Sequence, residues 1–75
     1  MNETEMVWFS VSELKIMTAK HILKEAGIPP FTIDKKDSAH AGAFGDIELY
    51  VPKEFEGKAY ELLVDHGIII PDPNE

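Results

Sequence analysis

The stretch Gly45 to Pro52, with the sequence GDIELYVP, determines the predicted fold because it has the clearest alternation of apolar and polar residues in the chain. Successive side chains of a strand point to opposite faces of a sheet, so the alternation predicts a strand with one covered face and one open face. Pro52 ends the predicted strand, because proline has no backbone N–H to donate to a neighbouring strand. The predicted covered set is Ile47, Leu49 and Val51, and the predicted open set is Asp46, Glu48 and Tyr50.

A strand and a helix are predicted before this stretch. Residues Met6 to Phe9 are apolar and rich in β-forming types, which indicates a first strand. Two serines compete as the cap of the following helix: Ser10 has capping-box spacing to Glu13, and Ser12 would start the helix half a turn later. The helix ends at Gly27, which suits a left-handed C-terminal position, and Pro29-Pro30 prevent its continuation. Its predicted sheet-facing stripe consists of Val11, Ile16, Ala19, Ile22, Leu23 and Ala26.

The remaining elements follow from local composition. Phe31 to Asp34 is a predicted second strand, in which Phe31 and Ile33 share a face. Lys35 to Ala43 is small and polar and is expected to be a loop that joins this strand to the central one. A second helix is predicted from Pro52 to Gly67, followed by a fourth strand at 68–70.

The predicted order of elements is βαββαβ. With right-handed crossovers, this order gives an α+β, ferredoxin-like sandwich in which two helices cover one face of a four-stranded antiparallel sheet in the order 4-1-3-2. A chain of 75 residues has room for one modest core, so residues 5–70 are expected to form a single domain. Residues 1–4 and 71–75 are expected to be flexible termini.

Composition restricts the classes of function. The net charge of −7 disfavours nucleic acids and anionic lipid, and the lysines are spread along the chain. The third strand also lacks an RNA-recognition pattern, because Asp46 stands where a stacking aromatic residue is needed. The chain has no cysteine, no signal-peptide pattern and no run long enough to span a membrane, so we expect a cytoplasmic protein.

No residue pattern in the sequence indicates an enzyme, a metal site or a cofactor site. His21, His40 and His66 lack the pairwise spacing of metal ligands, and Gly42 and Gly45 are not followed by the Gly-Lys-Ser/Thr of a phosphate loop. Acidic residues around the predicted hairpin do not follow the calcium-loop pattern. We therefore expect a non-enzymatic protein that needs no cofactor.

The open face of the predicted sheet is the strongest candidate for a functional surface. We expect it to carry Tyr50, one of Trp8 and Phe9, and Phe44, and to bind a protein partner or a second copy of the chain. The adjoining loop adds further candidates, since long loops often carry binding residues. The loop candidates are Lys35, Lys36, Asp37 and His40.

Two segments carry a resemblance to a known family: HILKEAGIPPFTIDKKDSA, residues 21–39, and FGDIELYVPKEF, residues 44–55. They resemble a small bacterial family of prokaryotic signal-transducing proteins with a GlnB-like, PII-related fold. The resemblance covers about residues 7–66 and implies a signalling role and association into oligomers. PII proteins bind nucleotide and 2-oxoglutarate, but the residues that do so have no matching motif in this chain.

Two functions remain open on the sequence. The first is an interaction or regulatory module that acts through the open face and the loop 35–43. The second is a small-ligand sensor of the PII kind that binds a nucleotide or a small anion.

Overall fold

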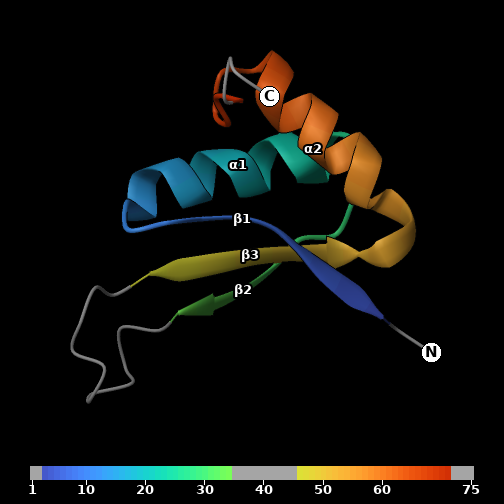
Figure 1. The fold of residues 1–75 in the computed structure, drawn as a ribbon, viewed down its shortest axis with the longest axis horizontal. Helices are drawn as coiled ribbons and strands as arrows, with labels where there is room; N and C mark the ends of the chain where they lie inside the picture. The colour runs from blue at the N-terminus through green and yellow to red at the C-terminus, as the bar shows by residue number, and fades with distance from the viewer. Residues whose placement is uncertain (1–2, 35–45, 72–75) are drawn as a thin grey trace.

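The computed structural model describes residues 3–34 and 46–71, which form a three-stranded antiparallel sheet and two α-helices. Both helices lie on the same side of the sheet (Figure 1). An α+β domain with its helices on one face is therefore confirmed. The elements in chain order are β1 (Thr4–Ser10), α1 (Glu13–Glu25), β2 (Phe31–Asp34), β3 (Ile47–Pro52), the short 3-10 helix η2 (Lys53–Phe55) and α2 (Glu56–Asp65).

The predicted central strand is the middle strand of the sheet. The strand order is β1-β3-β2, and β3 runs antiparallel to both neighbours. Ile47, Leu49 and Val51 are buried, whereas Glu48 and Tyr50 are half-buried, so the alternation expected from the sequence is present. Leu49 and Val51 pack with Leu23 of α1 and Leu63 of α2 in one cluster of buried side chains.

The fourth strand expected at 68–70 is not present. These residues instead complete a Schellman motif at the end of α2, in which Gly67 has a positive φ of 76°. The Gly67 N–H donates to Val64 O at 3.0 Å, and the Ile68 N–H donates to Leu63 O at 2.9 Å. Ile69 then enters the core, so the apolar character of this segment serves packing at the helix end and not strand pairing.

The same motif ends α1. Gly27 has a φ of 81° and donates to Lys24 O at 3.0 Å, and the Ile28 N–H donates to Leu23 O at 2.9 Å. Leu23 and Ile28 are both fully buried, which is the apolar contact that usually accompanies this cap. The two helix ends are therefore closed by hydrogen bonds and also contribute to the core.

Ser12 is the N-cap of α1. Its Oγ accepts a hydrogen bond from the Lys15 N–H at 3.2 Å. Ser10 has a different role, because its Oγ accepts from the Ser12 N–H at 3.0 Å. Since the helix starts at Glu13, Val11 lies before it and is exposed, although the sequence placed it in the sheet-facing stripe.

The start of β1 is two residues earlier than expected. Thr4 pairs with Pro52, and the Lys53 N–H donates to Glu3 O at 2.9 Å. Thr4 is therefore part of β1, and Glu3 just before it is held by a backbone hydrogen bond from the residue after β3. Neither helix in the described ranges is long and apolar enough to cross a membrane.

Candidate functional site

The uncovered side of the sheet presents two adjacent rows of side chains. Each row contains one residue from each of the three strands. Directly opposed residues of antiparallel strands share a face and lie about 4.5–5.5 Å apart at their Cβ atoms, so each row is continuous. We call these six residues the open face. The rows are Met6–Tyr50–Phe31 and Phe9–Glu48–Ile33.

Four of the six residues of the open face are large, apolar and about half exposed. Aromatic and aliphatic side chains in neighbouring rows form one patch rather than isolated surface residues. The exposed fractions are 42% for Met6, 53% for Phe9, 50% for Phe31 and 49% for Ile33.

A β-bulge decides which aromatic residue of β1 belongs to the open face. The register shifts between Met6 and Trp8, so that Met6 is opposite Tyr50 but Trp8 is opposite the buried Leu49. Val7 and Trp8 are both partly buried and pack against the core. Of the two aromatic candidates of β1, Trp8 is therefore on the helix-covered face and Phe9 is on the open face.

The polar groups of the open face interact with each other. The Tyr50 hydroxyl donates a hydrogen bond to Glu48 Oε1 at 2.9 Å. This hydrogen bond, together with partial desolvation and the negative charge of Glu48, raises the pKa of Tyr50 above its ordinary value. The phenol therefore keeps its proton to a higher pH than an unperturbed tyrosine does.

The one charged residue among the six of the open face is Glu48. None of the three strands contains a lysine or arginine, whereas each contains one acidic residue: Glu5, Asp34 and Glu48. The lysines of the described residues lie on α1, η2 and α2. Glu5 and Asp34 are opposite the buried Val51 and Ile47, so of these three acids only Glu48 is on the open face.

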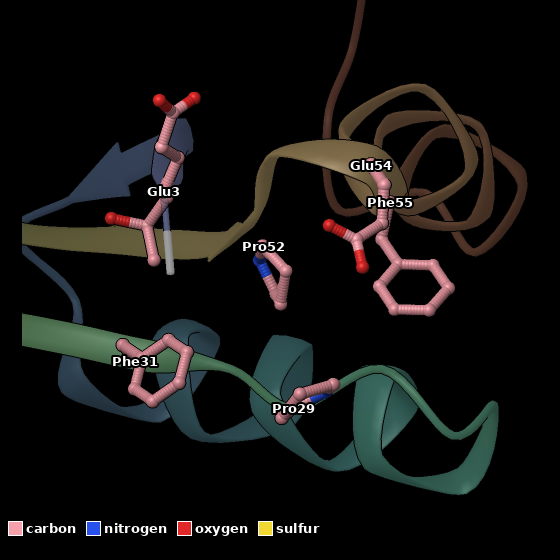
Figure 2. Close-up of a pocket in the computed structure, with 7 residues that line it drawn as sticks. Glu3, Pro29, Phe31, Pro52, Glu54 and Phe55 are labelled. Atoms are coloured by element: carbon pink, nitrogen blue, oxygen red, sulfur yellow. The ribbon is translucent and has the colours of Figure 1, made fainter. Parts of the chain in front are cut away.

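A pocket adjoins the open face at the end where β3 leaves the sheet (Figure 2). It has a volume of about 560 Å³, and Phe31 belongs both to it and to the open face. Glu54 directs its carboxylate toward the space between Pro52 and the Phe55 ring, whereas the Glu3 carboxylate is turned away from it. The residues that line the pocket are Glu3, Thr4, Pro29, Phe31, Pro52, Glu54 and Phe55.

The two acidic residues of this pocket differ in their surroundings. Glu3 Oε1 lies 3.6 Å from Lys53 Nζ, an exposed ion pair that partly balances its charge. Glu54 is exposed next to the half-buried Phe55. Glu54 is therefore the acid best placed to meet a cationic group in the pocket.

A second groove lies between the ends of the two helices. It has a volume of about 490 Å³ and is lined by His21, Glu25 and His66 together with apolar residues. His66 Nδ1 donates to Leu62 O at 2.9 Å, and His21 Nε2 lies 3.8 Å from Glu25 Oε2. Within 3–34 and 46–71, no three His, Cys, Asp or Glu residues form a group that could hold a metal ion.

Five of the residues singled out from the sequence lie outside the described residues. They are Lys35, Lys36, Asp37, His40 and Phe44. Of the two others, Tyr50 is on the open face and Trp8 is not.

Sequence reasoning did not assign Met6, Phe31 and Ile33 to the functional surface. A signal for two of them was present, because the alternation in Phe31 to Asp34 placed Phe31 and Ile33 on a common face. The register against β3, which decides whether that face is covered or open, is a long-range property.

The chain matches no protein-family model, and no curated protein or solved structure matches it.

Proposed function

We propose that the chain is a non-enzymatic interaction module whose open face binds a protein partner or a second copy of the chain. The observation that carries this proposal is the patch of four large apolar side chains, each about half exposed, in two adjacent rows of one sheet face. The resemblance to prokaryotic signal-transducing proteins is consistent with such a role but adds no binding residue.

The size of the domain makes this patch significant. A chain of 75 residues has little apolar surface to spare from its core, yet Phe9 and Phe31 lie outside it. Buried aromatic residues at the centre of an interface commonly supply most of its binding energy. The open face therefore has the composition of the centre of an interface, with polar groups supplied by the hydrogen-bonded pair Tyr50 and Glu48.

Exposed apolar residues on α1 are a weaker candidate. Leu14 and Met17 are 72% and 64% exposed, but they lie on a single helix beside Lys15 and Thr18. Scattered apolar residues of this kind are ordinary on protein surfaces. They supply instead the matched controls for substitutions in the open face.

Two observations favour a binding role over the alternatives. No polar or charged side chain is buried in the described ranges, so those ranges offer no desolvated acid, base or nucleophile of the kind that active sites use. A sensor for a nucleotide or a small anion would need a cationic or N–H-lined site. The pocket beside the open face carries Glu3 and Glu54, and Lys20 and Lys24 line only a smaller hollow of about 200 Å³ formed by α1 alone.

The test is the molar mass by light scattering at tens of micromolar, together with retention of partners from the native cell extract. The variants are Tyr50→Ser and Phe31→Ser, and Met17→Ser is the control with comparable exposed apolar area. We expect both open-face variants to lose a self-associated species or a retained partner that Met17→Ser keeps. A strictly monomeric wild type, with the same proteins retained by all three variants, would show that the open face is ordinary solvated sheet.

A further inference from the structure

The pocket and the open face form one continuous surface. Phe31 belongs to both. Pro52, two residues after Tyr50 on β3, also lines the pocket (Figure 2). A ligand that covers the two rows of the open face would therefore reach the pocket without leaving the surface. The pocket volume of about 560 Å³ is within the range of roughly 300–1,000 Å³ that is typical of ligand sites.

The chemistry of this surface specifies the charge of its ligand. The chain has a net charge of −7, and the one charged residue of the open face is Glu48. Glu54 adds a carboxylate at the pocket, next to the Phe55 ring. A partner with basic groups at these two places would meet opposite charge, whereas an acidic partner or a second copy of this acidic chain would be repelled.

The pocket lining also distinguishes between basic groups. A guanidinium group stacks on aromatic rings and donates parallel hydrogen bonds to a carboxylate, and a lysine ammonium does neither as well. Phe31 and Phe55 supply rings and Glu54 supplies the carboxylate. The pocket is thus better suited to arginine than to lysine.

We propose that the open face and its pocket bind an extended peptide segment of a partner protein that presents apolar side chains and an arginine on the same face. The apolar side chains cover Met6, Phe9, Phe31 and Ile33, and an arginine enters the pocket against Glu54. This inference rests on the proposed function and narrows its partner to one class.

The probe is a fluorescently labelled eight-residue peptide in which one face consists of three valines and a terminal arginine and the other face consists of serines. Its binding is followed by anisotropy at low and high salt. A peptide with citrulline in place of arginine keeps the shape but removes the charge, and a glutamate peptide reverses the charge. Glu54→Gln tests the pocket, Phe31→Ser tests the apolar surface, and Glu61→Gln on α2 is the control for a lost negative charge.

We expect the wild type to bind the arginine peptide more tightly than the citrulline peptide and not to bind the glutamate peptide. Glu54→Gln should weaken binding of the arginine peptide about fivefold, as for an accessible charge pair, and Glu61→Gln should bind like the wild type. Added salt should weaken the binding of the arginine peptide and leave the binding of the citrulline peptide unchanged.

Two outcomes would overturn the inference. Equal binding of the arginine and citrulline peptides, weakened for both by Phe31→Ser, would show an interaction surface without selection for charge and would leave the proposed function standing. Absence of binding by every peptide would exclude this class of partner, and the light-scattering comparison would then decide the proposed function separately.

Discussion

The Tyr50 hydroxyl donates a 2.9 Å hydrogen bond to the Glu48 carboxylate two residues earlier on the same face of β3. The bond joins the two rows of the open face, because Tyr50 belongs to one row and Glu48 to the other. It also gives the open face a spectroscopic signal that can be measured without a partner.

We predict that Tyr50 titrates above its ordinary value of about 10 and that Glu48→Gln lowers its midpoint. The pKa of Tyr50 is raised first by the hydrogen bond to Glu48, then by desolvation and by the carboxylate charge. The stabilisation from the protonated phenol is therefore complete below about pH 10 and is lost as pH rises through the folded-state pKa. Tyrosinate absorbance in a Tyr60→Phe background measures the midpoint of Tyr50 alone. The same midpoint with and without Glu48→Gln would contradict the assignment.

The covered and open faces of the sheet predict unequal losses of stability when side chains of equal size are truncated to alanine. Leu49 is fully buried, so Leu49→Ala should lower the free energy of unfolding by about 2–5 kcal/mol through the cavity that it leaves. Ile33 is half exposed on the open face, so Ile33→Ala should cost about 1 kcal/mol or less. Denaturant unfolding of both variants provides the comparison. Similar losses at the two positions would mean that the helices do not cover the Leu49 side alone.

Ser12→Ala should destabilise the domain by about 1 kcal/mol, because it removes the side chain that accepts the Lys15 N–H at the start of α1. Ser12→Asp keeps an acceptor and places a negative charge near the helix N-terminus, so it should be within about 0.5 kcal/mol of the wild type. Thermal unfolding resolves the difference, since 1 kcal/mol corresponds to a shift of about 4–8 °C in a domain of this size. A larger loss in Ser10→Ala than in Ser12→Ala would move the cap to Ser10.

The sequence predicted the parts of the fold that depend on local periodicity. The alternation in Gly45 to Pro52 and the spacing of Ile16, Ala19 and Leu23 report directly which side chains are covered, and the structure agrees with both. The glycines at the two helix ends were likewise readable, because a left-handed cap favours glycine whatever surrounds it.

Two features could not be predicted from the composition of their own segments. The bulge between Met6 and Trp8 is a property of the pairing of β1 with β3, and no residue pattern within β1 indicates it. It places Trp8 on the covered face and Phe9 on the open face, the reverse of a regular pairing. The segment 68–70 has the composition of a strand, but hydrogen bonds from Ile68 and Ile69 to Leu63 O fold it onto the helix end. In the first case the pairing with another strand decides the structure, and in the second the helix cap overrides the strand propensity of the segment.

The two glycines Gly27 and Gly57 should respond in opposite directions to the same substitution. An added Cβ meets no atom within 4 Å at either site, so crowding contributes to neither result. Gly27 has a φ of 81°, in the left-handed region where a Cβ costs roughly 1–2 kcal/mol, so Gly27→Ala should destabilise the domain by about that amount. Gly57 is in α2, where alanine is the better helix former, so Gly57→Ala should stabilise it by about 0.5–1 kcal/mol. Denaturant midpoints of the two variants test the pair. A neutral or stabilising Gly27→Ala would show that α1 does not end in the Schellman motif, and the anchoring of Ile28 against Leu23 would need another explanation.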